Sequence, residues 1–237
     1  MKTKYLFLSL VAGLMACLTS CQHDNLEVQP QAFEKGEISR SVSGANRILV
    51  LSEGNMTNEN GTLAEIIWEE DQLQVTDSIY QKRNPGRKLG NVAQDLYILG
   101  DTMYIICQNG HVQGGDSSLV VMNANTYERI RSIGKGFGTA YGSSPTHFAV
   151  VSHQKAYVRC DNGLKIAYLQ GANQGLQPEV LIPDAAKTKL AVIDGMVYAA
   201  RVNSVARINP GDDAVSDIAI NQGAIASIVR GSGNTLW

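Results

Sequence analysis

The sequence lacks excess basic charge, metal-ligand spacings and sustained helical periodicity, which would indicate a nucleic-acid partner, a metal site or a helical core. Its 237 residues carry 20 Lys and Arg against 22 Asp and Glu, so no positive field would attract nucleic acid. The 4 histidines, at positions 23, 111, 147 and 153, include no pair with zinc-site spacing, and no acidic pattern repeats as a calcium loop requires. Helical periodicity is sparse, and only residues 182–190 predict a short helical turn. The composition is instead typical of a soluble β-protein rich in turns.

Motifs for catalysis are also missing. The glycines of residues 134–138 are not followed by a helix, so a phosphate-binding loop is not expected. Residues 142–145, Gly-Ser-Ser-Pro, do not have the spacing of a nucleophile elbow. The sequence therefore predicts a protein that is not an enzyme and that needs no cofactor or metal.

Cysteines are few. Cys107 and Cys160 each follow a tyrosine by three residues, which predicts equivalent strand positions in adjacent repeats. Adjacent packed sheets lie about 10 Å apart, whereas a disulfide needs Cα atoms within about 7 Å. We expect two buried free thiols; a disulfide between them is the alternative.

The N-terminal residues 1–21 predict a targeting segment. Two lysines precede an apolar run over residues 5–18, which is shorter than the roughly 20 residues of a membrane-spanning helix. The run ends in Leu-Thr-Ser-Cys, which resembles the bacterial lipoprotein box, and this resemblance implies that Cys21 carries the lipid. An ordinary signal peptide cleaved near Ala16 is the alternative. A lipid with two or three acyl chains would anchor the protein stably in the outer membrane.

Residues 22–46 are polar and carry no sustained period, so we expect a flexible tether. Asp24 and Glu27, close behind Cys21, resemble a short export signal that sends some lipoproteins to the cell surface.

A repeat organises the remaining sequence. A turn followed by an apolar and then an aromatic residue recurs at Tyr104, Tyr157, Tyr198 and Trp237, with spacings of 53, 41 and 39 residues. A four-stranded propeller blade takes about 40 to 50 residues. A β-sandwich would show the same hairpins, but it would not require the long repeat.

We therefore predict an all-β chain, a β-propeller over residues 47–237 that is truncated at its C-terminal side. Four complete four-stranded blades are expected, followed by the start of a fifth at residues 224–229; the intact protein would have two or three further blades. The four blades are predicted over residues 48–84, 90–136, 146–183 and 188–222.

Three segments carry a resemblance to a known family. The segments are residues 48–56 (Ile-Leu-Val-Leu-Ser-Glu-Gly-Asn-Met), 83–85 (Arg-Asn-Pro) and 89–104. They resemble the opening of the YncE-like (YVTN-type) surface β-propeller lipoproteins. This family includes cobalamin-capturing lipoproteins that cap a TonB-dependent transporter of the outer membrane. The resemblance implies a seven-bladed, non-enzymatic protein that captures a ligand.

Propellers bind ligands where loops from successive blades gather around the axis. The loops that enter each blade, with those that follow each second strand, supply polar groups for such a site. The candidate residues are Asn91, Gln94, His111, Thr146, His147, Arg159, Asp161, Asn162, Lys187, Arg201 and Asn203.

These observations predict a lipid-anchored outer-membrane β-propeller at the cell surface that binds a small nutrient or cofactor-like molecule, with cobalamin as one candidate, for a TonB-dependent transporter. A protein-interaction scaffold is the first alternative, and it would show exposed apolar patches and no deep polar pocket. A quinoprotein-like or lyase propeller enzyme is the second.

Overall fold

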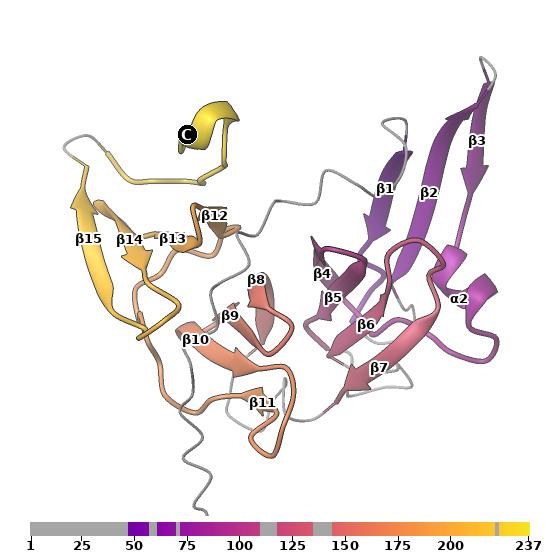
Figure 1. The fold of residues 1–237 in the computed structure, drawn as a ribbon, viewed down its shortest axis with the longest axis horizontal. Helices are drawn as coiled ribbons and strands as arrows, with labels where there is room; N and C mark the ends of the chain where they lie inside the picture. Colours follow the sequence, from indigo (N-terminus) through magenta and orange to yellow (C-terminus); the bar gives the residue numbers. More distant parts are fainter. Residues whose placement is uncertain (1–46, 57–60, 70–71, 110–117, 135–143, 221–222) are drawn as a thin grey trace, which may run out of the picture. The chain divides into compact units, whose positions relative to one another are not determined.

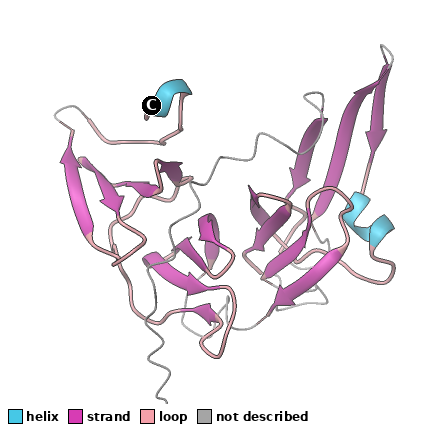
Figure 2. Ribbon diagram, viewed as in Figure 1, coloured by secondary structure: helices cyan, strands magenta, loops and turns pink. Residues whose placement is uncertain are grey.

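The computed structural model describes residues 47–56, 61–69, 72–109, 118–134, 144–220 and 223–237. The chain divides into two units, Met1–Ala32 and Phe33–Trp237, and all described residues belong to the second. Strands dominate this unit (Figure 2). No helix within these described ranges is long and apolar enough to cross a membrane. The predicted signal segment with Cys21 and the predicted tether lie outside the described residues.

The strands form four antiparallel sheets in chain order (Figure 1). Sheet 1 contains β1 (Arg47–Ser52), β2 (Thr62–Glu69) and β3 (Gln72–Thr76). A short helix, α2 (Ile79–Arg83), separates it from sheet 2. Sheet 2 contains β4 (Ala93–Leu99), β5 (Thr102–Cys107), β6 (Leu119–Asn123) and β7 (Arg129–Ile133).

Sheets 3 and 4 repeat the same up-and-down order. Sheet 3 contains β8 (Pro145–Ser152), β9 (Lys155–Cys160), β10 (Gly163–Tyr168) and β11 (Gly175–Leu176). Sheet 4 contains β12 (Ala191–Ile193), β13 (Met196–Ala200), β14 (Ser204–Ile208) and β15 (Val215–Ala219). A 3-10 turn, η3 (Ser232–Asn234), lies near the end of the chain.

The first strand of each sheet contacts the first strand of the next. β1 contacts β4, β4 contacts β8, and β8 contacts β12. Sheets that pack in succession through their first strands are the blades of a β-propeller, in which these strands lie nearest the axis. The predicted fold class is therefore confirmed.

The second strand of sheet 2 shows how the blades are held together. Alternate side chains of β5 point to opposite faces, as the strand geometry requires. Tyr104 and Ile106 pack with residues of sheet 3, whereas Met103, Ile105 and Cys107 pack with residues of sheet 1. A strand can bury both faces in this way only because sheets cover it on both sides.

The repeated tyrosines also form polar links between neighbouring sheets. The hydroxyl of Tyr104 lies 2.8 Å from Nδ1 of His153, in the turn between β8 and β9. The hydroxyl of Tyr157 donates a hydrogen bond to Asp213, in the turn between β14 and β15. Burial raises the pKa of Tyr104 to about 12, so its hydroxyl stays protonated at neutral pH. At Tyr104 and Tyr157, the aromatic marker of the repeat therefore lies at the contact between neighbouring blades.

Two local predictions differ from the structure. Residues 182–190 form no helix, because Ile182 pairs with the backbone of Leu164 and precedes Pro183, which disfavours the helical conformation. The short helix forms instead at Ile79–Arg83, within the residues predicted for blade one. Its buried residues Ile79 and Tyr80 pack in the cluster between sheets 1 and 2. Sheet 1 accordingly has three strands in the described residues, where four were expected.

The expected fifth-blade strand at residues 224–229 is not formed. Val229 and Trp237 instead exchange two backbone hydrogen bonds of 2.8 and 2.9 Å, which fold the last residues back on themselves. Ile228 packs with Ala200 and Val205 of sheet 4. Residues 223–237 therefore lie against sheet 4 and do not extend as a further strand.

The expectation for the two cysteines is confirmed. Cys107 and Cys160 end the second strands of adjacent sheets, and both are free and buried. Burial raises the pKa of the Cys107 thiol to about 12, so the reactive thiolate is rare at neutral pH.

The packing between sheets predicts a large cost for truncating a side chain there. Replacing Ile106, which is fully buried between sheets 2 and 3, with alanine should lower the free energy of unfolding by about 2 to 5 kcal/mol. Ile130→Ala on β7 of the same sheet is the matched control, because this isoleucine is exposed. Urea unfolding followed by circular dichroism measures both; equal losses in the two variants would contradict the arrangement.

Candidate functional site

The predicted site residues that the structure describes lie at one end of their sheets. Pro145 at the start of β8 pairs with Cys160 at the end of β9, and Ala93 pairs likewise with Cys107 in sheet 2. In each sheet, the segment before the first strand therefore lies beside the turn after the second strand. We call this the proximal end of the sheet.

A charged cluster joins three sheets at the first strands. Asp95 of β4 is buried, and one of its oxygens lies 2.9 Å from Nζ of Lys189, just before β12. Its other oxygen lies 3.4 Å from Nδ1 of His147 on β8. The carboxylate also accepts hydrogen bonds from the backbone N–H groups of Leu96 and Phe148.

Asp95 is held in its charged form. Burial opposes ionisation, but the hydrogen bonds from His147 and Lys189, with the charge of Lys189, outweigh it and lower the pKa of Asp95 below its ordinary value. The cluster thus places a carboxylate, an imidazole and an ammonium group where three blades meet, and the Lys189 side chain is largely exposed.

The segment before β12 collects further candidates. The Arg159 Nε–H donates to the carbonyl oxygens of Ala185 and Ala186, at 2.7 and 3.1 Å. Lys187 Nζ lies 3.0 Å from Asp161 Oδ1. These contacts tie the end of β9 in sheet 3 to residues 185–187, so the structure brings together three of the predicted residues.

Arg201 is held within sheet 4. Its guanidinium forms salt bridges with Asp184, at 2.9 Å, and Asp217, at 2.7 Å. The first and largest cause of its raised pKa is the hydrogen bond to Asp184, followed by that to Asp217. Because its charge is balanced by Asp184 and Asp217, Arg201 has a structural role and is a weak candidate for binding a ligand.

Three other predicted residues make structural hydrogen bonds. Thr146 is fully buried and its hydroxyl donates to the carbonyl oxygen of Arg159, at 3.1 Å. Gln94 Nε2 donates to Glu53 Oε1, at 2.6 Å. Asn91 is buried and its Nδ2 donates to the carbonyl oxygen of Met56, at 3.3 Å.

Two buried polar atoms at the proximal end have no hydrogen-bond partner within the described ranges. They are Oδ1 of Asn91 and Nη1 of Arg159. An unpaired buried polar group costs about 1 to 3 kcal/mol, so each atom favours a water or ligand atom beside it.

The remaining candidates do not join these contacts. Asn162 and Asn203 are exposed in the turns after β9 and β13. His111 lies outside the described residues. In the part of the chain that the structure describes, no group of three or more His, Cys, Asp or Glu side chains could hold a metal ion.

Sequence reasoning missed Asp95 and Lys189, which organise the charged cluster. Asp95 is the single charged residue in the segment Ala93–Leu99, and such a lone carboxylate in a strand was the available signal. Nothing local marked Lys189, because its role depends on a contact with a residue 94 positions earlier.

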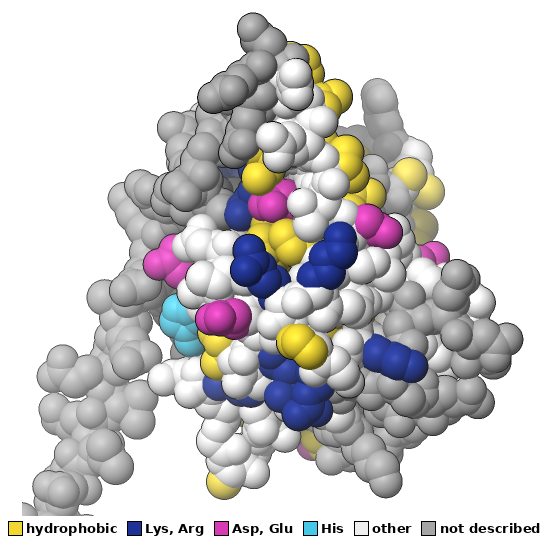
Figure 3. Space-filling view, turned by 90° about the vertical axis from the view of Figure 1, so that its right-hand side faces the viewer, with side chains coloured by type: hydrophobic (Ala, Val, Ile, Leu, Met, Phe, Trp, Pro, Cys, Tyr) yellow, Lys and Arg dark blue, Asp and Glu magenta, His cyan; other side chains and the backbone are white. Residues whose placement is uncertain are grey.

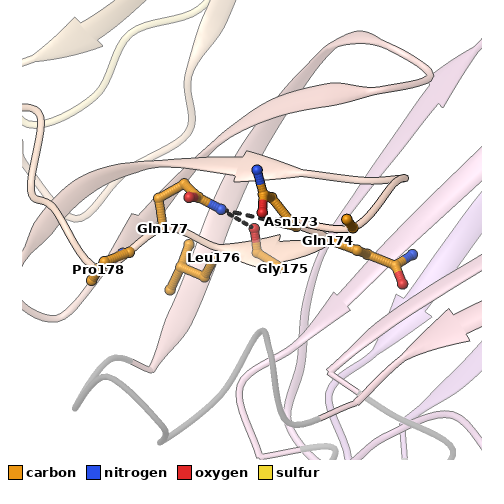
Figure 4. A pocket seen from close by; sticks show the side chains of 7 residues that line it. Asn173, Gln174, Gly175, Leu176, Gln177 and Pro178 are labelled. Atoms are coloured by element: carbon orange, nitrogen blue, oxygen red, sulfur yellow. Dashed lines mark hydrogen bonds between the residues drawn. The ribbon is translucent and has the colours of Figure 1, made fainter.

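A small hollow lies away from this end. Residues Ala172–Pro178, which comprise β11 and the residues on either side of it, line a hollow of about 260 Å³. Gln177 closes it by donating to the carbonyl oxygens of Asn173 and Gly175, at 3.2 and 3.3 Å (Figure 4). None of its lining residues is charged, and none was among the predicted site residues.

The chain matches a known protein family over most of its length. Residues 46–237 match DUF5074, a domain of unknown function. The chain belongs to the DUF5074 family. No curated protein sequence matches this DUF5074 chain significantly.

Several solved structures are similar to this chain. The extracellular domain of the one component system BT4673 from B. thetaiotaomicron matches with a TM-score of 0.50 and 14% identity, covering 81% of this chain and 24% of that chain. The extracellular domain of the hybrid two component system BT3049 from the same organism matches with a TM-score of 0.48 and 14% identity, covering 86% and 28% of the two chains. PorZ, a surface component of the type-IX secretion system of Porphyromonas gingivalis, matches with a TM-score of 0.46 and 12% identity, covering 80% and 26%. The DUF5074 chain thus spans about a quarter of the length of these proteins.

The charged cluster predicts a pH-dependent contribution to stability. Asp95→Asn should lower the free energy of unfolding by about 1 to 3 kcal/mol at pH 7, because the buried hydrogen bonds lose their charged acceptor. The folded-state pKa is lowered, so the stabilisation is present above the ordinary aspartate pKa of about 4 and is lost as the pH falls through the folded value. The difference between wild type and variant should therefore shrink as the pH falls below about 4.

The matched control is Asp161→Asn, which removes an exposed ion pair and should cost at most about 1 kcal/mol. Urea unfolding at a series of pH values measures both variants. If the free energy of unfolding differed between wild type and Asp95→Asn by the same amount at every pH, the proposed role of the Asp95 charge would be contradicted.

Proposed function

We propose that this DUF5074 protein is a lipid-anchored β-propeller on the outer surface of the outer membrane. It binds a polar nutrient or cofactor-like ligand at the proximal ends of its blades and delivers it to a TonB-dependent transporter. The protein captures its ligand and does not transform it.

The charged cluster of Asp95, His147 and Lys189 carries this proposal. Three successive blades contribute one residue each, and the first strands lie nearest the axis. A ligand that contacts the cluster would therefore bind close to the axis of the propeller. The exposed ammonium of Lys189 and the imidazole of His147 offer hydrogen bonds to a polar ligand, while Asp95 holds both in place. The orphaned buried atoms of Asn91 and Arg159 add polar capacity at the same end of the sheets.

The surface location rests on the sequence and on one structural relative. The basic start, the apolar run and the Leu-Thr-Ser-Cys ending favour lipidation at Cys21. The BT4673 domain, which shares the fold, is extracellular. Cobalamin is one candidate ligand, through the resemblance to the YncE-like lipoproteins.

Lipidation has a direct test. Cells that express the intact gene product and grow with an alkyne-tagged fatty acid should yield a labelled protein in the outer-membrane fraction. Cys21→Ala should lose the label, whereas Cys17→Ala should keep it. Equal labelling of the wild type and Cys21→Ala would overturn the assignment.

Ligand capture is tested by calorimetric titration of the intact gene product, with Cys21→Ala to prevent lipidation, against a panel of corrinoids and other transported cofactors. We expect one panel member to bind with nanomolar affinity. Lys189→Ala and His147→Ala should each weaken that binding at least about tenfold, because each removes a polar contact. Arg207→Ala is the control, since this arginine is exposed on the third strand of sheet 4.

Two outcomes would count against capture. Absence of binding across the panel, or binding that is unaffected by both cluster variants, would remove the proximal ends as the ligand site. Chromatography of the released ligand separates capture from turnover, because capture returns the ligand unchanged.

A second function, as a protein-interaction scaffold, is favoured by the exposed face of sheet 1. Its apolar side chains share one side of the sheet, because cross-strand partners point the same way. The exposed members are Ile48, Val50, Trp68, Leu73 and Val75. Such a one-sided apolar surface suits packing against another protein surface. A ligand-free protein that co-purifies with a surface partner, and that loses it in Trp68→Asp, would favour this function.

A further inference from the structure

We propose that a basic surface around α2 rests on the phosphate-bearing lipid head groups of the membrane that anchors the protein. This inference deepens the proposed function, because it depends on the lipid anchor. The basic surface consists of Lys82, Arg83, Arg87, Lys88 and Arg129.

The charge of this surface departs from that of the whole chain. Four basic residues fall within seven positions, and no acidic residue occurs between Asp77 and Asp95. The whole chain has a net charge of −2. Residues 82–88 are therefore a locally basic segment in a chain that is slightly acidic overall.

Three of these cations differ from other charged residues of the described fold in forming no salt bridge. Elsewhere in the described residues, Lys155, Lys187 and Arg201 each form a salt bridge with an aspartate. Across the described part of the chain, Lys82, Arg83 and Lys88 form no salt bridge, although all three are exposed. Their charge is available to a partner outside the fold.

The side chain of Asn84 holds the basic segment in a defined place. Its Nδ2 donates to the carbonyl oxygens of Tyr80 and Tyr127, both at 2.8 Å. Its Oδ1 accepts the backbone N–H of Arg129, at 2.8 Å. The end of α2 is thereby fixed against the start of β7, and Lys and Arg side chains gather on that side of the molecule (Figure 3).

The chain enters the first sheet beside the same elements. Arg47 opens β1, and its Nη2 donates to the carbonyl oxygen of Ala124, at 3.0 Å. Its guanidinium lies 5.5 Å from the ring centre of Tyr127, whose carbonyl Asn84 binds. The predicted lipid-bearing residue, Cys21, precedes Arg47 by 26 positions in the chain. The predicted anchor is therefore close in sequence to the strand that enters beside the basic surface.

A lipid surface is the partner that these observations favour. Exposed Lys and Arg side chains bind anionic membranes, and each strengthens binding about fivefold near the surface. A protein partner would require apolar contact as well, whereas Lys82, Arg83, Arg87 and Lys88 are separated only by Asn, Pro and Gly. Each side chain contributes only weakly to membrane binding, so the basic surface orients an anchored protein and does not replace its anchor.

Vesicle sedimentation tests the proposal. The intact gene product with Cys21→Ala, which cannot be lipidated, is mixed with neutral phosphatidylcholine vesicles or with vesicles that contain about 30 mol% phosphatidylglycerol. The neutral vesicles report any binding by the apolar N-terminal run. We expect partitioning to rise with the anionic lipid and to fall as salt is added.

Variants assign this increase to the basic surface. The anionic increment is the increase in vesicle binding that the phosphatidylglycerol causes. Lys82→Ala combined with Lys88→Ala should lower this increment by at least about 25-fold. Arg207→Ala combined with Arg230→Ala removes the same charge elsewhere and should preserve most of the increment. Equal losses in the two double variants, or no increment in the wild type, would overturn the proposal.

A further arm separates lipid from free phosphate. Inorganic phosphate added at constant ionic strength should not displace the protein, and displacement would show a site for soluble anions instead. This outcome is independent of the ligand titration and of the fatty-acid labelling. Failure of the basic surface would therefore leave ligand capture and lipidation standing.

Discussion

Each middle blade of this propeller buries both of its faces, and the other features of the structure depend on that constraint. Apolar burial contributes about 25 cal/mol for each Å² removed from water, and a single twisted sheet can bury only one face unless another sheet covers the second. β5 and β9 satisfy this requirement with almost continuously buried sequences. Sheet 1 does not satisfy it, and its outer face keeps Ile48 and Val75 in contact with water.

Stacking of the blades also explains where polar chemistry gathers. Because every first strand lies against the next, Asp95 of sheet 2 can meet His147 of sheet 3 and Lys189 before sheet 4. Water is largely excluded from the Asp95 carboxylate, so its contacts are electrostatically stronger than they would be on an open surface. The same stacking places the hydroxyls of Tyr104 and Tyr157 against neighbouring blades, where they direct the packing.

The proposed functions divide the surface between these regions. The proximal ends offer polar groups close to the axis, the exposed face of sheet 1 offers apolar area, and the segment around α2 offers exposed positive charge. A lipid-anchored capture protein would use the first for its ligand and the last for orientation. The charged cluster is built on and beside first strands, whereas the basic surface is built on α2 and the residues that follow it.

The sequence by itself determined the period of the blades, because turn residues and alternating apolar residues act locally. The turn at Gly100 and the aromatic Tyr104 predicted a hairpin correctly, and the equal offsets of Cys107 and Cys160 from their tyrosines predicted equivalent buried thiols. The helix at Ile79–Arg83 escaped prediction, since its stability comes from burying Ile79 and Tyr80 between two sheets and not from a helical pattern of its own. Residues 224–229 have the composition of a strand, but Ile228 packs on sheet 4 and Val229 pairs with Trp237. Only the tertiary structure decided which polar residues meet, because Asp95 and Lys189 are 94 positions apart and the packing of the sheets brings them to 2.9 Å.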